Sequence, residues 1–79
     1  MAKQPYVTTS ELAKLLDVSV ATVNYYTNLG LFTIQDRKGY HRLYDAREVQ
    51  TLFHRIKQMR KEGYSLRLIQ NRIDKGYSI

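Results

Sequence analysis

The side chains best suited to recognition chemistry lie on a short segment that opens at Ser19. Asn24 carries an amide that can pair with both N6 and N7 of adenine in the major groove of DNA, and Ala21 can contact a thymine methyl group. Thr22 can bond a base edge or a phosphate, and Tyr25 can donate its hydroxyl to a phosphate. The alternative for each is an ordinary solvated side chain. These residue types favour a surface that reads DNA.

A second group of candidates is basic and lies in residues 37–44. Arg37, Lys38 and Arg42 are the charges best placed to hold a phosphate backbone. An ion pair with a neighbouring acid is the alternative for Arg42. Tyr40 and Tyr44 can each bond a phosphate through the hydroxyl or pack against the core, and the sequence leaves both roles open.

A third group surrounds a predicted link between two helices, and its members are Arg60, Lys61 and Tyr64. Ser65 follows as the cap of the next helix, and a helix N-terminus suits a phosphate because its first amides are free. Contacts of this kind fix the register of a protein on DNA, whereas base-edge contacts select the sequence.

Residues 8–30 supply the elements that position the first group, two short helices joined by a tight turn. Thr8 and Glu11 form a capping-box pattern, and Ser19 caps the second helix. Gly30 is expected to end that helix in the left-handed conformation. The residues expected to face inward are Leu12, Leu15, Leu16, Val20 and Val23. The pattern predicts a helix-turn-helix, and a helical hairpin without a ligand shares it.

The second group lies on a predicted β-hairpin, a wing over about residues 33–44. Its first strand is expected to use the apolar Leu31, Phe32 and Ile34, with a polar turn at residues 36–39. In the second strand, Tyr40 and Arg42 would share one face, opposite His41 and Leu43.

Two supporting helices follow, over about residues 46–62 and 66–75. Asp45 and Glu48 form a second capping box, and Ser65 and Gly76 bound the last helix. The apolar residues at helical spacing are Val49, Leu52, Phe53, Ile56 and Met59 in the longer helix, and Leu66, Ile69 and Ile73 in the shorter. The sequence therefore predicts a mainly α single domain over residues 1–79, a winged helix-turn-helix with two further helices.

Charge is concentrated in the middle of this 79-residue chain, whose net charge is +6. Residues 37–61 carry eight lysines and arginines against Asp45 and Glu48, a net charge of +6 by themselves. This distribution favours a polyanion partner.

Composition also bounds the class of protein. There is no cysteine, and the two histidines, His41 and His54, fall in different elements. His54 is expected to be a partly buried packing residue. We expect no enzyme, no cofactor and no metal site, and no membrane partner because no apolar run approaches the ~20 residues that span a bilayer. The expected location is the cytoplasm, at the nucleoid.

The order of these residues resembles MerR-type transcription regulators over roughly residues 6–74. The matching residues are Thr9, Ser10, Glu11, Leu12, Ala13, Val18, Ser19, Val20, Thr22, Val23, Tyr25, Tyr26, Leu29, Gly30, Leu31, Gly39, Tyr40, His41, Arg42, Leu43, Tyr44, Glu48 and Val49, then residues 61–66. The resemblance implies a bacterial regulator that binds double-stranded DNA, as a homodimer on an inverted repeat in a promoter where RNA polymerase acts. It also implies that the second helix enters the major groove, and that the wing and the later link hold phosphates.

The chain departs from the family pattern in two positions of the second helix. Asn24 stands where the family commonly has arginine, and Ala21 where it commonly has a basic or polar residue. Typical members also continue into a long dimerisation helix and an effector domain. The sequence leaves open whether this is a piece of such a regulator or a short relative.

Two other binding modules share these features. One is an architectural DNA-binding protein, excisionase-like or chromosome-organising, which would bind cooperatively with little sequence choice. The other is a protein-interaction domain that uses the third and fourth helices. Oligomers that form only on DNA are a further alternative to the dimer.

Overall fold

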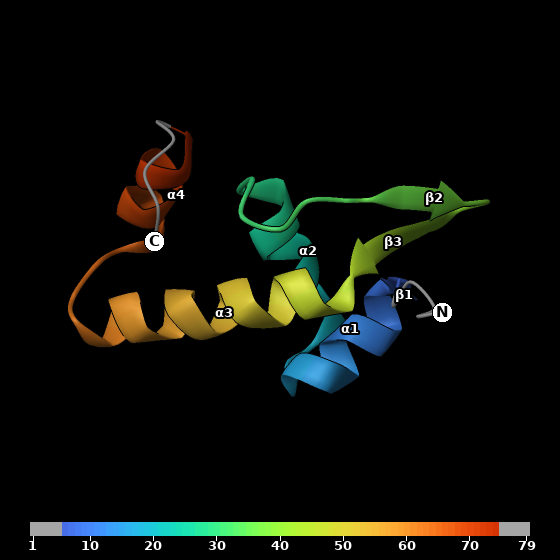
Figure 1. The fold of residues 1–79 in the computed structure, drawn as a ribbon, viewed down its shortest axis with the longest axis horizontal. Coiled ribbons are helices and arrows are strands. Elements are labelled where there is room, and N and C mark those ends of the chain that lie inside the picture. The colour runs from blue at the N-terminus through green and yellow to red at the C-terminus, as the bar shows by residue number, and fades with distance from the viewer. Residues whose placement is uncertain (1–5, 75–79) are drawn as a thin grey trace.

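The longest helix runs along one side of the fold (Figure 1), and its apolar stripe contributes to a core that it shares with the other helices and the wing. The computed structural model describes residues 6–74. Its elements are β1 (Tyr6–Thr8), α1 (Thr9–Leu16), α2 (Val20–Asn28), β2 (Asp36–Lys38), β3 (His41–Asp45), α3 (Ala46–Lys61) and α4 (Leu66–Asp74). This architecture confirms the mainly helical winged helix-turn-helix. Gly76, the predicted end of the last helix, lies outside the described residues.

The helix-turn-helix is capped as its sequence predicts. The Thr8 hydroxyl accepts from the Glu11 amide at 3.2 Å, and the Glu11 carboxylate accepts from the Thr8 amide at 2.9 Å. Ser19 Oγ accepts from the Thr22 amide at 3.1 Å and so caps α2. The turn contains one feature that the pattern did not reveal. Asp17 adopts a left-handed conformation, φ 58°, and its amide donates to the carbonyls at the end of α1.

Two residues predicted to face inward are exposed. Leu12 and Val23 are fully buried, but Leu15 is 50% exposed and Val20 is 42% exposed. The prediction for Leu15 is wrong because α1 buries its Leu12–Ala13 side, where the other elements pack against it. The prediction for Val20 is wrong because this residue begins α2 and lines a hollow at the surface.

The wing is the hairpin of β2 and β3, and β1 pairs with β3 to extend it into a three-stranded antiparallel sheet in the order β1-β3-β2. The first strand of the hairpin is the polar segment Asp36–Lys38, where a turn was predicted. Leu31 and Phe32 are 2% and 3% exposed, because the loop after α2 carries them into the core. The hairpin turns at Gly39 and Tyr40, with Gly39 at φ 61°.

The two supporting helices match their predicted caps and stripes. Val49 and Ile56 of α3 and Ile69 of α4 are buried, and the other stripe residues pack against them. Asp45 accepts from the Glu48 amide at 3.1 Å. The second capping box is only half formed, since the Glu48 carboxylate accepts from the Gln35 side chain at 3.1 Å. No helix in residues 6–74 is long and apolar enough to span a membrane.

Candidate nucleic-acid interface

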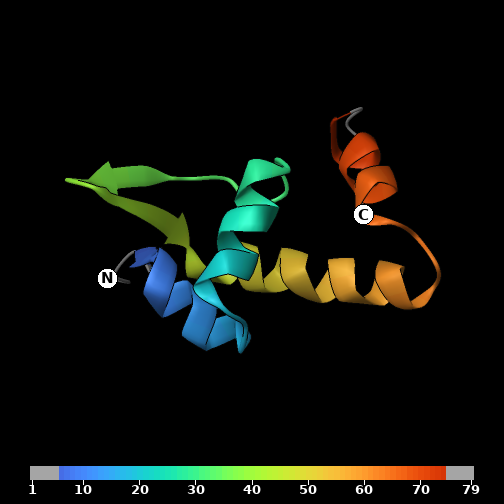
Figure 2. The same cartoon turned by 180° about the vertical axis from the view of Figure 1, so that it is seen from behind.

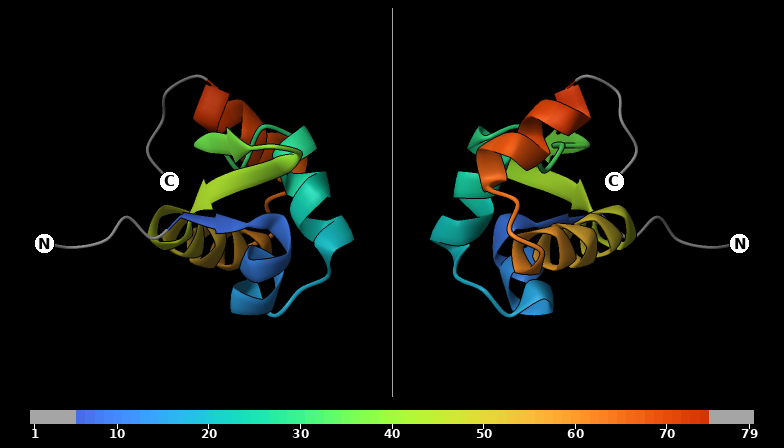
Figure 3. Two further views of the ribbon diagram at one scale, coloured as in Figure 1. Left: turned by 90° about the vertical axis from the view of Figure 1, so that its right-hand side faces the viewer. Right: turned by 90° about the vertical axis from the view of Figure 1, so that its left-hand side faces the viewer.

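Helix α2 forms one edge of the molecule, and no other element lies outside it in either view of Figure 3. Its inner side is fixed by Val23, which is fully buried, and by Thr27, whose hydroxyl bonds Tyr44 Oη at 2.8 Å. Successive helical residues turn by about 100°, so Ala21 and Tyr25 occupy the opposite side. Both are exposed, Tyr25 by 53%. The predicted reading surface of α2 is therefore accessible.

One flank of α2 faces the wing across a hollow of ≈ 410 Å³, which we call the wing-side hollow. Its walls come from both elements: Asn24 and Asn28 from α2, and Tyr40, His41 and Arg42 from the hairpin. Asn24 is half-buried in this wall, and Asn28 lies one turn further along the helix. The structure thus brings the predicted amide and the predicted wing arginine together.

The register of the hairpin pairs Arg37 directly with Arg42. Cross-strand partners project from the same face of a sheet, and like charges in this position repel. Neither arginine forms an ion pair within residues 6–74, so the alternative of an Arg42–Asp45 pair is not observed there. Two guanidinium groups without an ion pair in these residues therefore lie on one face of the hairpin.

The two tyrosines of the wing differ in exposure. Tyr40 is fully exposed at the tip, outside β3, so it does not share a strand face with Arg42 as predicted. Tyr44 is fully buried and its hydroxyl bonds Thr27. Of the two roles considered for Tyr44, phosphate contact and core packing, the structure shows core packing. Tyr44 is withdrawn as a phosphate contact because its hydroxyl does not reach the surface.

At the far end of α3, the predicted phosphate contacts surround the link to α4. Arg60 and Lys61 are exposed, and Tyr64 is half-buried with the Arg72 guanidinium 5.3 Å from its ring centroid. Ser65 Oγ accepts from the Leu68 amide at 3.1 Å, which confirms its capping role. In Figure 2, α2 crosses in front of α3, with the hairpin on one side and α4 on the other. The two predicted phosphate-contact regions therefore lie at opposite ends of the face that carries α2.

The other flank of α2 faces α3 across a second hollow of ≈ 710 Å³, which we call the α3-side hollow. Its lining residues are Tyr26, His54, Lys57, Gln58, Arg60 and Lys61. His54 is exposed, which makes its predicted packing role wrong, since α3 buries the Phe53 side of this turn. Four of these residues were not predicted as site residues, namely Tyr26, His54, Lys57 and Gln58. The spacing of the last three could have indicated a shared surface, because residues 54, 57, 58 and 61 lie on one face of a helix.

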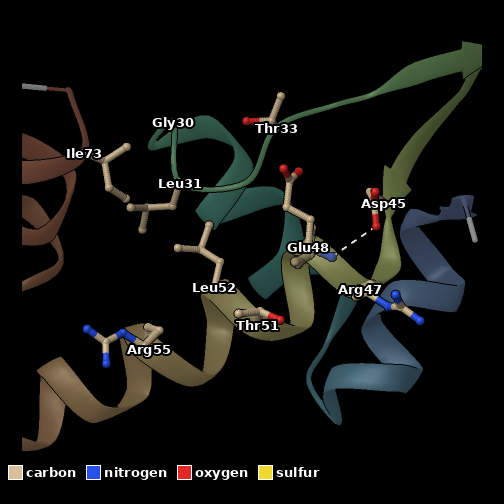
Figure 4. A pocket seen from close by; sticks show the side chains of 11 residues that line it. Gly30, Leu31, Thr33, Asp45, Arg47, Glu48, Thr51, Leu52, Arg55 and Ile73 are labelled. Atoms are coloured by element: carbon tan, nitrogen blue, oxygen red, sulfur yellow. Dashed lines mark hydrogen bonds between the residues drawn. The ribbon is translucent and has the colours of Figure 1, made fainter. Parts of the chain in front are cut away.

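A third hollow, of ≈ 570 Å³, lies between α3, α4 and the loop after α2 (Figure 4). Leu31, Leu52 and Ile73 gather at one end, and Asp45 and Glu48 lie at the other. Arg55 lines it as well. Within residues 6–74, no three histidine, aspartate or glutamate side chains come together as a metal site.

Comparison with known proteins gives one family. The model of the MerR HTH family of regulatory proteins matches residues 7–76. The nodulation protein NolA of Bradyrhizobium sp. (strain NC92) is 37% identical over 65 residues, which cover 81% of this chain and 27% of that protein. The HTH-type transcriptional regulator CueR of Bacillus subtilis is 38% identical over 65 residues, 82% of this chain and 45% of the relative.

The chain thus spans less than half the length of these curated relatives. No solved structure is matched significantly. The match to the family model covers the helix-turn-helix, the wing and both supporting helices, in the order that the fold requires. The chain belongs to the MerR family of helix-turn-helix, DNA-binding transcription regulators.

Proposed function

We propose that this domain recognises one duplex DNA sequence with α2 in the major groove and the wing on the phosphate backbone. The observation that carries this proposal is the wing-side hollow, where Asn24 and Arg42 line the same space, and Arg42 pairs across the hairpin with Arg37. In this arrangement the Asn24 amide would read an adenine edge. The two arginines, which form no ion pair in the described residues, would bind the adjoining phosphates of the same duplex.

All the predicted contact residues except the buried Tyr44 have a role in this binding mode. Asn24 reads an adenine edge, Ala21 contacts a thymine methyl, and Thr22 contacts a base edge or phosphate. Tyr25 donates to a phosphate from the exposed side of α2. The remaining contacts go to the backbone, from Ser19, Arg37, Lys38, Tyr40, Arg42, Arg60, Lys61 and Tyr64.

Membership of the family supports further partners besides DNA. We propose that two copies bind an inverted repeat, either as a preformed homodimer or by assembling on the DNA, and that the target is a promoter used by RNA polymerase. A symmetric dimer presents the same surface twice, so it selects a site with matching symmetry.

The test is a titration of the chain into labelled duplexes, of mixed sequence and of the promoter beside its own gene, over a salt series. The affinity should fall by about 0.9 log units per log unit of salt for each phosphate held. A preference for one inverted repeat that persists at higher salt supports the regulator. Cooperative binding without preference would indicate the architectural protein, and absence of binding at low salt would indicate a protein-interaction domain.

A further inference from the structure

The α3-side hollow is lined mainly by polar and cationic side chains from a single helix. His54, Lys57 and Lys61 occupy positions i, i+3 and i+7 of α3, and all three are exposed. Tyr26 contributes the wall from α2. The basic surface at the end of α3 therefore extends back along the helix until it adjoins α2.

Lys57 is held next to α2 by an aromatic cluster. Its Nζ lies 5.5 Å from the centroid of the Phe53 ring, and that ring lies 5.9 Å from the ring of Tyr26. A cation over an aromatic face keeps its hydrogen-bond donors and its charge. Lys57 forms no ion pair within the described part of the chain. The ammonium group is thus positioned at the hollow with its charge available.

The two hollows lie on opposite flanks of α2. The wing-side hollow contains Asn24 and Arg42, and the α3-side hollow contains Tyr26 and Lys57. A helix in the major groove of B-DNA, about 12 Å wide, has one sugar-phosphate backbone along each of its sides. Cationic groups on both flanks can therefore meet two different strands.

We infer that the α3-side hollow binds a phosphodiester of the strand opposite the one held by the wing. Lys57 is its central contact, and His54 and Gln58 are flanking polar contacts. This inference rests on the proposed function and adds residues that neither the sequence patterns nor the family resemblance assigned. In this arrangement the wing binds the phosphates of one strand and α3 binds those of the other.

The test compares Lys57→Gln with Arg55→Gln in duplex binding over a salt series. Arg55 is exposed on the same helix but lines the hollow of Figure 4, so its loss changes the net charge equally at another surface. Lys57→Gln should lower the salt slope by about 0.9, and Arg55→Gln should leave it near the wild-type value. Lys57→Arg, which keeps the charge, should restore the slope, and this separates a lost contact from a lost fold.

A scan with single neutral methylphosphonate linkages then identifies the strand. A variant that has lost a contact becomes insensitive to neutralisation of the phosphate it held. Lys57→Gln should lose sensitivity on one strand, and Arg42→Gln on the other. Loss on the same strand, or a Lys57→Gln profile equal to that of Arg55→Gln, overturns the inference while the proposed function stands. If the unaltered chain binds no duplex, both fail.

Discussion

The two flanks of α2 differ in construction although both carry positive charge. The wing side consists of strands of three and five residues, whereas the α3 side is a helix of 16 residues on the core. The wing side presents two amides, one arginine and one histidine, whereas the α3 side presents two lysines and an arginine beside one amide and one histidine.

This difference suggests that the two flanks contribute differently to DNA binding. Phosphate contacts position a protein, and base-edge contacts give it sequence preference. In the wing-side hollow the amides belong to α2 itself and adjoin a cation, whereas the α3-side hollow is richer in cations, which suit phosphates. Since the hairpin is small, it depends on the core for its position. Tyr44 links the wing to α2, because it is buried and its hydroxyl bonds Thr27.

The largest effect is expected from Tyr44→Ala, which removes this link. Loss of a large buried aromatic side chain costs about 3–5 kcal/mol, much of the stability of a domain this small. Chemical denaturation followed by circular dichroism should show the decrease. Tyr44→Phe, which keeps the ring, should cost only about 1 kcal/mol. Equal midpoints for Tyr44→Ala and the unaltered chain would mean that Tyr44 does not anchor the wing.

The next effect is expected from the double variant Arg37→Gln/Arg42→Gln. The salt slope of DNA binding should fall by about 0.9 for each of the two contacts. Stability should stay the same or increase slightly, because the variant relieves a like-charge pair across the strands. Binding titrations and denaturation of the same preparation measure both quantities. An unchanged slope would remove the wing from the proposed interface.

A smaller and more selective effect is expected from Asn24→Ala. Discrimination at one base-pair position should relax by about 1–3 kcal/mol, with the salt slope unchanged. Competition between duplexes that differ at single positions provides the measurement, and Asn28→Ala one turn away is the matched variant. A uniform loss of affinity for all sequences would assign Asn24 to the backbone.

The smallest effects are expected at the two turns that bound the interface. Gly39 at the wing tip has φ 61°, and Gly63 at the link between α3 and α4 has φ 102°. An added Cβ would meet nothing within 4 Å at either position, so the cost is backbone strain alone. Gly39→Ala should lower stability by about 1–2 kcal/mol, the usual cost of a left-handed conformation in an L-residue. Gly63→Ala should cost more, because its φ lies further from the left-handed minimum. Denaturation midpoints in the reverse order would contradict this reasoning.

Local signals in the sequence determined the helices and their starts. Thr8, Ser19, Asp45 and Ser65 each cap the helix that their position predicts, because a capping hydroxyl or carboxylate acts on amides only two or three residues away. The stripe of α3 was equally readable, since its spacing reflects the geometry of one helix. These elements and the order of the motifs were enough for the family.

Tertiary packing decided which side chains remain at the surface. Leu31 and Phe32 look like a strand but lie in the core, while Leu15 and Val20 follow an apolar pattern but stay exposed. Tyr44 is buried, and its hydroxyl bonds Thr27 of α2, which lies 17 residues away in the chain. The Arg37–Arg42 pairing and the position of Lys57 beside Tyr26 likewise depend on contacts between separate elements. A side chain's surroundings depend on which element packs beside it, and no local pattern contains that information.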